Sequence, residues 1–277
     1  MQGKTVVATG ATSGIGEVAA KTLAGMGARI VFIARDARRA AATLATLEQI
    51  APGRGHRFHI ADLSLMTETR RVGGEIAASE ARIDVLINNA GAMFSDRRVT
   101  AEGLELTFAL NHMAYFVLTK MLEQRLAGTP QARVVSTASG AHRGARLDFA
   151  DLQCARGYSG MRAYRRSKLA NILFTRVLAR RLSDSGVTAN CLHPGLVATR
   201  FGDEAGGWTG RLFPLVKRFA ISPEQGAQTI VTLASSPEVA STSGKYFEKQ
   251  KVRAPSGAAQ DDKAAELLWA RSEELAE

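Results

Sequence analysis

A strand, a glycine-rich turn and a helix follow one another at the start of the chain. The apolar, β-branched run at 4–9 has the length of a buried strand, TGATSGIG occupies 9–16, and apolar residues then recur at helical spacing. Gly10, Gly14 and Gly16 let the backbone turn tightly and approach a pyrophosphate, which would lie over the positive end of the helix. The order predicts a dinucleotide-binding unit, and a turn without a ligand is the alternative interpretation.

Strand-like segments alternate with helical patterns along the rest of the chain. After 4–9 they occur at 28–34, 56–61, 83–88, 132–138, 187–193 and 244–248. This alternation requires right-handed crossovers, and it predicts an α/β fold with a doubly wound parallel sheet of about seven strands. Because no repeat, low-complexity tract or linker divides the 277 residues, we expect one domain over 1–277.

Cysteine content and hydropathy indicate the cellular compartment in which the protein is expected. The two cysteines, Cys154 and Cys191, lack metal-like spacing, so we expect free thiols in a reducing compartment and no metal site. The chain opens almost directly into its first strand, without a basic and apolar signal segment. No apolar run approaches the ~20 residues of a membrane span. We therefore expect a cytoplasmic protein without stable membrane insertion.

The formal net charge is +10, from 36 Lys and Arg against 26 Asp and Glu. The excess is spread along the chain, and no nucleic-acid-binding motif organises it. We expect most of it to be solvated surface that also attracts an anionic cofactor, and we expect no nucleic-acid partner.

Tyr164 and Lys168 stand four positions apart in YRRSKLAN, which places both side chains on one face of a helix. A phenol is a poor acid or base at neutral pH because its pKa is about 10. A nearby ammonium favours the phenolate and is expected to lower that pKa, which would make Tyr164 usable in acid–base catalysis. Two side chains on a solvated helix face are the alternative interpretation.

Several further segments resemble those of the short-chain dehydrogenase/reductase family, in the family's order. The glycine turn has the spacing G-x-x-x-G-x-G, DVLINNAG occupies 84–91, and Asn111 stands in FALNHMAYFVLT. Ser139 follows in RVVSTASGAH, and HPGLVAT occupies 193–199. The resemblance runs through most of the chain, and it implies a Rossmann fold and an oxidoreductase that acts on CH–OH or C=O groups of a small molecule.

The resemblance implies a catalytic role for each of four residues. Tyr164 would donate the proton in carbonyl reduction, and Lys168 would lower the pKa of Tyr164 and bond the nicotinamide ribose. Ser139 would bond the substrate oxygen, and Asn111 would support a water-linked proton path to Lys168. The alternatives are a strand-end turn for Ser139 and helix packing for Asn111.

The end of the second strand bears on the cofactor. An NAD site places a carboxylate there, whereas an arginine accommodates a 2′-phosphate, and Arg35 occupies this position. Ser13, where many NADP-binding relatives have a second basic residue, and Asp36 argue in the other direction. We predict NADP(H) in preference to NAD(H).

Asp62 resembles an aspartate that contacts adenine, and a helix N-cap is its competing role. The residues expected to bind the cofactor are Gly10, Thr12, Ser13, Gly14, Ile15, Gly16, Arg35, Asp62, Leu63, Asn89, Ala90, Gly91, Tyr164, Lys168, Pro194, Gly195, Val197 and Thr199.

Ser139 and Tyr164 are 25 positions apart, a wider gap than is common in the family. The inserted segment resembles that of retinol-dehydrogenase-like and WW-domain-oxidoreductase-like members. The glycine-rich and then apolar segment at about 200–222 occupies the position of the family's substrate loop, and it suggests a lid over a lipophilic substrate. An ordinary amphipathic helix packed on the domain is the alternative.

The sequence leaves two other functions open. One is a non-catalytic nucleotide-sensing or scaffold protein on the same fold, and the other is a different reaction on a related scaffold, such as epimerisation or dehydration. An intact Asn111, Ser139, Tyr164 and Lys168 set argues against the first. We also expect a homo-oligomer, because family members commonly pair through the helices that contain Asn111 and Tyr164.

Overall fold

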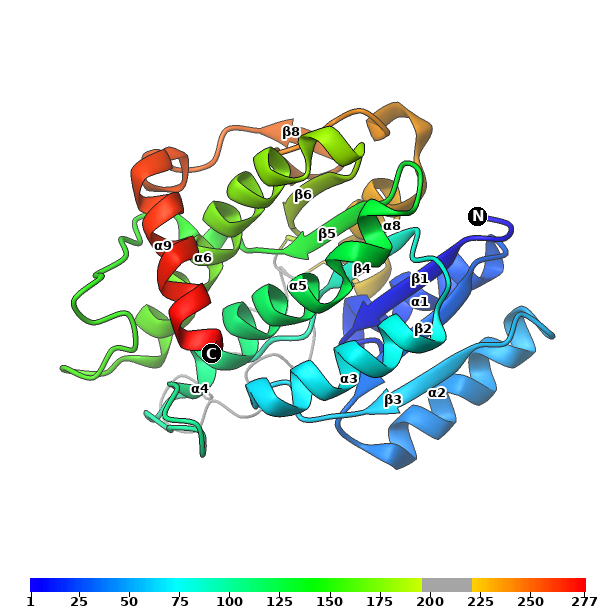
Figure 1. Cartoon of the computed structure of the whole chain (residues 1–277), viewed down its shortest axis with the longest axis horizontal. Coiled ribbons are helices and arrows are strands. Elements are labelled where there is room, and N and C mark those ends of the chain that lie inside the picture. The colour runs from blue at the N-terminus through cyan, green and yellow to red at the C-terminus, as the bar shows by residue number, and fades with distance from the viewer. Residues whose placement is uncertain (196–220) are drawn as a thin grey trace.

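The strands of the protein form one sheet, seen in a computed structural model that describes residues 1–195 and 221–277 (Figure 1). Its order is β3-β2-β1-β4-β5-β6-β7-β8, and all neighbouring strands are parallel except β7 and β8. The strands are β1 (Thr5–Thr9), β2 (Arg29–Ala34), β3 (Arg57–Ile60), β4 (Val85–Asn88), β5 (Arg133–Thr137), β6 (Thr188–His193), β7 (Tyr246–Glu248) and β8 (Lys251–Arg253). The predicted doubly wound parallel sheet is confirmed.

The sheet differs from the prediction by one additional strand. β8 pairs antiparallel with β7 across Lys249 and Gln250, whose φ values of 50° and 64° lie in the left-handed region. β8 has only three residues, KVR, and all three are exposed, so no run of strand length marks it in the sequence. The hairpin also lacks the Asn-Gly or Asp-Gly pair that usually marks such a turn.

The central strands are buried on both faces because helices cover both sides of the sheet. In β1, Val7 faces one apolar core and its neighbours Val6 and Ala8 face the other. The first core also takes side chains from α3 (Met66–Ser79), α5 (Ala114–Ala127) and α6 (Gly160–Arg181). The second takes them from α1 (Gly14–Gly25), α2 (Ala37–Ile50) and α8 (Pro223–Ser235).

The direction of strand order reverses at β1, which lies between β2 and β4. In open α/β sheets, ligands bind outside the carboxyl ends of the strands at such a switch point. The glycine turn that follows β1 and the NNAG segment that follows β4 therefore meet at one edge of the sheet.

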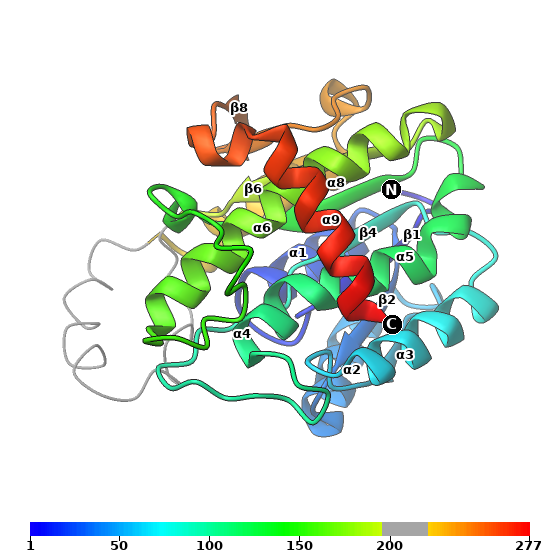
Figure 2. The ribbon, with the colours of Figure 1, turned by 60° about the vertical axis from the view of Figure 1, so that its left-hand side comes forward.

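Helix α9 (Asp262–Ala276) crosses the outer side of α5 and α6 (Figure 2). The Trp269 ring centre lies 5.0 Å from that of Phe116 and 5.8 Å from that of Phe174. Arg176 and Arg180 of α6 each donate to Asp262 at 2.8 Å. The chain itself therefore covers part of the surface through which pairing was expected, and the oligomeric state stays a prediction.

The predicted substrate loop at about 200–222 lies outside the described residues, apart from Ile221 and Ser222. Across 1–195 and 221–277, the helices are too short or too polar for any of them to cross a bilayer.

Candidate active site

The turn after β1 needs glycine at three places. Gly10 and Gly14 have φ values of 67° and 56°, in the region where a side chain is strained. A Cβ atom on Gly16 would lie 2.2 Å from the Gly10 carbonyl oxygen and 2.4 Å from Nδ2 of Asn89. Ser13 precedes α1 in an extended conformation and its side chain makes no capping hydrogen bond, so the first N–H groups of the helix need another acceptor. The role of this turn in phosphate binding stays a prediction.

Asn89 joins three strand ends at this edge. Its Nδ2 donates to the carbonyl oxygens of Thr9 and Gly10, at 3.4 and 3.3 Å, and its Oδ1 accepts from the Thr137 hydroxyl at 3.1 Å. The Thr9 hydroxyl in turn accepts from the N–H groups of Asn89 and Ala90, at 2.9 and 3.0 Å. The ends of β1, β4 and β5 are thus held in one register.

Asn111 lies in a π-helical turn, η1 (Ala109–Met113), between the short α4 (Leu106–Phe108) and α5. Its side chain exchanges hydrogen bonds with the N–H and carbonyl of Ala92, both at 2.9 Å, and donates to Ser167 Oγ at 3.0 Å. Its carbonyl oxygen accepts from Asn171 Nδ2 at 2.9 Å. A π-turn frees a backbone carbonyl for such a contact and is frequent at functional sites.

Lys168 is 3% exposed and lies at the centre of the group. Its ammonium donates to the Thr137 carbonyl oxygen at 3.0 Å and lies 5.7 Å from the ring centres of both Tyr115 and Tyr164. A Cβ on Gly91 would lie 3.4 Å from it. Burial lowers the pKa of Lys168 to about 7, so this amine gains or loses its proton in the neutral range.

Ser139 and Tyr164 lie together, as expected, but the pKa of Tyr164 differs in direction from the expectation. Burial raises it to about 12, and the hydrogen bond with the Ser139 side chain lowers it only in part. The phenol is therefore protonated at neutral pH. Sequence reasoning allowed for the charge of Lys168 but not for desolvation, which here acts on both groups and disfavours the charged form of each.

His142, in the turn η2 (Gly140–His142), fixes the backbone of Ser139. Its Nε2 accepts from the Ser256 N–H at 3.1 Å, so Nδ1 bears the proton and donates to the Ser139 carbonyl oxygen at 2.6 Å. The side chain is fully buried, and burial lowers its pKa, which favours this neutral form.

The segment between Ser139 and Tyr164 is held by arginines that flank Tyr164 on α6. Arg165 donates to the carbonyl oxygens of Ala141 and Arg143, at 3.2 and 2.6 Å. Arg162 donates to the carbonyls of Arg156 and Gly157, and Arg166 donates to that of Asp151 at 3.1 Å. Donors that look like surface charge in the sequence therefore fix the insert next to α6.

A cavity of about 370 Å³ lies where the chain leaves β2 and β3. Arg35, Asp62 and Ser64 line one part of it, and the remaining lining residues are Phe94, Arg98, Leu106 and Leu110. The structure thus brings the two residues expected at the adenosine end into one cavity.

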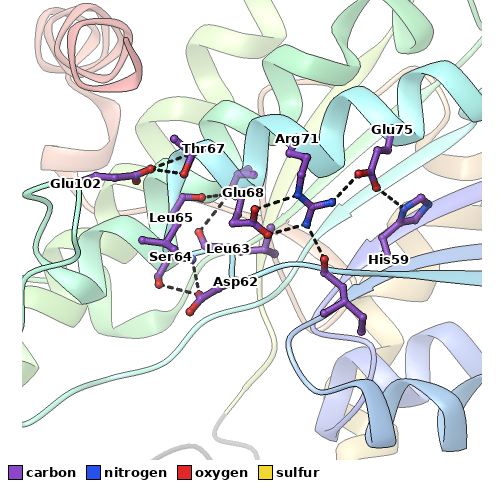
Figure 3. Close-up of polar contacts among 12 residues, drawn as sticks. His59, Asp62, Leu63, Ser64, Leu65, Thr67, Glu68, Arg71, Glu75 and Glu102 are labelled. Atoms are coloured by element: carbon purple, nitrogen blue, oxygen red, sulfur yellow. Dashed lines mark hydrogen bonds and ion pairs between the residues drawn. The ribbon is translucent and has the colours of Figure 1, made fainter.

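Asp62 does not cap a helix, in contrast to one of its two expected roles. Its Oδ1 accepts from the N–H and hydroxyl of Ser64, at 3.0 and 2.7 Å, and so closes a tight turn (Figure 3). The N-terminus of α3 is capped instead by Glu102, which accepts from the N–H groups of Met66 and Thr67. The Asp62 carboxylate remains on the cavity wall, where it is available to a ligand.

The other residues expected at the cofactor follow the ends of four strands. Thr12 and Ile15 belong to the glycine turn and α1, Leu63 follows β3, and Ala90 and Gly91 follow β4. Pro194 and Gly195 follow β6, and Gly195 has a φ of 94°. Val197 and Thr199 lie outside the described residues.

Four residues of the network were missed by sequence reasoning: Tyr115, Thr137, Ser167 and Asn171. A signal was available for two of them, because Tyr164, Ser167, Lys168 and Asn171 follow the spacing i, i+3, i+4, i+7 of one helix face. Thr137 acts through its backbone carbonyl, and a backbone contact cannot be recognised from the residue type.

Within 1–195 and 221–277, no group of three or more His, Cys, Asp or Glu side chains could hold a metal ion.

The residues present fit a dinucleotide. The glycine turn leads into the positive end of α1 and packs so tightly at Gly16 that no side chain fits there, and a separate cavity is lined by a cation and a carboxylate. At the other end, a protonated phenol and a titratable lysine lie beside Ser139. The arrangement can hold a nicotinamide dinucleotide and exchange a proton at the end where the phenol lies.

Comparisons with known proteins agree with this geometry. The sequence model of a family described as "short chain dehydrogenase" matches residues 4–209. Retinol dehydrogenase 13 of Homo sapiens is 38% identical over 279 residues, which cover 99% of this chain and 84% of that protein.

Two solved structures extend the comparison. The structure of an uncharacterised Mycobacterium paratuberculosis protein is 33% identical, with a TM-score of 0.80 and coverage of 99% of this chain and 94% of its own. A short chain dehydrogenase from Burkholderia cenocepacia, solved in complex with NADP, is 27% identical, with a TM-score of 0.71 and coverage of 94% and 98%.

Proposed function

The chain belongs to the short-chain dehydrogenase family, and on that premise we propose that it transfers a hydride between NADP(H) and a lipophilic carbonyl or alcohol substrate, with Tyr164 as the acid–base group. Membership makes it an NAD(P)-dependent oxidoreductase of CH–OH and C=O groups. The cofactor preference, the substrate class and the roles of individual residues are our proposal.

One observation supports the proposal above all others. Asn111, Ser139, Tyr164 and Lys168 come from three separate segments of the chain, and the structure brings them to the same sheet edge as the glycine turn. Asn111 reaches α6 through Ser167, and Lys168 lies 5.7 Å from the Tyr164 ring centre. A sensor or scaffold protein would have no need of a buried lysine beside a tyrosine and a serine at this edge.

The proton chemistry follows from the pKa values. Tyr164 is protonated at neutral pH, so in the reductive direction it can give its proton to a carbonyl oxygen bonded by Ser139. The phenolate that remains would be stabilised by a protonated Lys168. Because the pKa of Lys168 is about 7, this lysine can hold the charge and then exchange a proton with solvent. A bound nicotinamide would supply or accept the hydride.

Asn111 helps to position Lys168 and Tyr164 through its hydrogen bond to Ser167 of α6. Both hydrogens of its Nδ2 are used by the Ala92 carbonyl and Ser167, whereas its Oδ1 accepts only from the Ala92 N–H and can take a second bond from a water on the path to Lys168. The turn at Gly10, Gly14 and Gly16 would hold the pyrophosphate. Asp62 and Arg35 would hold the adenosine end.

The proposed preference for NADP(H) depends on Arg35. Its guanidinium lines the 370 Å³ cavity at the end of β2, where a 2′-phosphate would lie. The Burkholderia structure with NADP supports the proposal as a relative that binds this cofactor.

The proposed lipophilic substrate depends on the insert and on the relatives. The retinol dehydrogenases act, as their names say, on a long apolar alcohol, and they are 34–39% identical to this chain. The insert that precedes α6 is fixed beside Tyr164 by three arginines, so it can form one wall of an apolar site.

A panel of aldehydes, ketones and alcohols of increasing chain length, assayed with NADPH or NADP⁺ and with NADH or NAD⁺, tests the proposal. We expect kcat/KM to increase with the chain length of the substrate and to be higher with NADP(H) than with NAD(H).

Arg35→Gln should lower kcat/KM for NADPH and leave that for NADH nearly unchanged. Arg54→Gln, which replaces an exposed arginine between α2 and β3, should change neither value. Equal or better kcat/KM with NADH in the wild type would contradict the cofactor preference. A flat chain-length profile would contradict the substrate class, and a complete lack of turnover would favour a sensor.

A further inference from the structure

A second cavity, of about 280 Å³, lies on the outer side of α6, where the β7–β8 hairpin and the segment at 254–260 pack against the helix. It shares no lining residue with the cavity that contains Arg35, or with the four catalytic residues proposed above. The lining residues are Ile172, Arg176, Gly244, Lys245, Tyr246, Val252, Arg253, Ala254, Pro255 and Gln260.

All charged side chains that line this second cavity are positive. Arg176, Lys245 and Arg253 come from α6, the start of β7 and the end of β8, so three separate segments each contribute a cation. Of the described residues that line the cavity, none is acidic. Asp262 engages only one end of Arg176, through Nη2 at 2.8 Å. Three cations around one hollow favour the binding of an anion there.

Two buried polar atoms of the lining lack a partner. The Tyr246 side chain is 2% exposed, yet its hydroxyl has no hydrogen-bond partner among residues 1–195 and 221–277. The Nε of Arg176 is also buried, and it too has no partner within those ranges. Buried donors are almost always satisfied, because an unmade hydrogen bond costs free energy. Both atoms belong to residues that line the cavity, so an acceptor bound there would supply the hydrogen bond that each of them lacks.

The remaining walls limit the kind of molecule that fits. Ile172, Val252 and Pro255 present apolar surface opposite the donors. A volume of about 280 Å³ is below that of most cofactor pockets, so a nucleotide is too large. We propose that this cavity is a binding site for a small organic carboxylate, whose oxygens accept from Arg176 and Tyr246 and whose short apolar chain packs on these walls.

Calorimetric titration of the full-length protein with hexanoate tests the proposal. The matched probes are 1-hexanol, which keeps the chain and lacks the charge, and inorganic phosphate, which keeps the charge and lacks the chain. We expect hexanoate to bind at one site, at least tenfold more tightly than either. Comparable binding of 1-hexanol or of phosphate would overturn the proposal, as would the absence of hexanoate binding at about 10 mM.

Variants locate the site. Tyr246→Phe and the pair Lys245→Gln with Arg253→Gln should each weaken hexanoate binding several-fold, since Lys245 and Arg253 are exposed and their replacement leaves the core intact. Arg54→Gln, an exposed arginine far from the hairpin, is the matched control for net charge and should leave binding unchanged. Because hexanoate could also enter the catalytic site, Tyr164→Phe is titrated in parallel. Loss of binding in Tyr164→Phe with retention in Tyr246→Phe would overturn the proposal.

Thermal unfolding without ligand gives a second measurement. Tyr246→Phe removes a buried hydroxyl that lacks a partner, so its Tm should be higher than that of the wild type. A lower Tm would show that the hydroxyl already has a partner in the ligand-free protein, which would remove it from the proposed site.

Discussion

The two ends of the candidate active site are built from different interactions. Around Lys168, fully or nearly buried side chains bond to one another and to backbone carbonyls such as that of Thr137. Around Asp62, exposed charges pair with one another: Arg71 donates to Glu68 and Glu75, both at 2.6 Å, and to the Ile60 carbonyl oxygen at 2.8 Å (Figure 3). Buried hydrogen bonds fix geometry independently of salt, whereas exposed ion pairs are screened and exchange with water. The end proposed to perform the chemistry is therefore held by buried hydrogen bonds, whereas the charges beside the proposed adenosine end can exchange partners with water.

The largest effect should come from Tyr164→Phe, which removes the proton and keeps the ring. We expect kcat/KM to fall by about 10²–10⁴-fold, the usual contribution of a positioned acid–base group, with the dissociation constant of NADPH almost unchanged. Steady-state kinetics and fluorescence titration of NADPH measure the two quantities. Substantial residual turnover would show that the buried end does not hold the acid.

Asn111→Leu tests the rigidity of the buried end. The substitution keeps the branched shape of the side chain but removes the hydrogen bonds to the Ala92 N–H, the Ala92 carbonyl and Ser167, so the free energy of unfolding should fall by about 3 kcal/mol. Urea denaturation at low and high salt gives the value, which should be the same at both. Ser167→Ala, which removes one of these bonds, is the control and should cost less. A loss that disappears at high salt would contradict the comparison.

The pKa of Lys168 tests whether the buried end of the site excludes water. NMR of the cofactor-free chain with ¹³C-labelled lysine should show one side chain that titrates near pH 7, absent in Lys168→Arg, while surface lysines titrate near about 10.4. Because the folded pKa is lower than the unfolded one, the folded chain binds fewer protons between these two values. The free energy of unfolding should therefore rise with pH across that window, and Lys168→Met should lose this rise. A titration with the surface lysines would show that Lys168 is solvated.

The smallest effect is expected at the charged end. Arg71→Ala breaks two ion pairs between exposed side chains and an exposed hydrogen bond to the Ile60 carbonyl, so its Tm should fall slightly at low salt and by less at about 1 M salt, where screening acts within a few ångströms. Thermal unfolding at the two salt concentrations measures this. A large decrease in Tm that persists at high salt would mean that this end is as rigid as the other.

The sequence was informative where function depends on residue type and local spacing. The glycine turn needs residues without a Cβ, and the parallel sheet follows from alternating segments, so both could be predicted. Contacts between distant segments could not: Glu102 caps a helix that begins 36 positions earlier, and His142 anchors Ser139 through the N–H of Ser256. The pKa of Tyr164 could not be predicted either, because its direction depends on burial, which only the packed structure shows.

Helix α9 also has a consequence for how the protein is made. Synthesis runs from the N-terminus, so every strand of the sheet leaves the ribosome before Trp269 is available to cover Phe116 and Phe174. During that interval the growing chain presents an aromatic surface on α5 and α6 that it cannot yet cover itself. A chain that ended before α9 would therefore leave this aromatic surface of α5 and α6 without its cover.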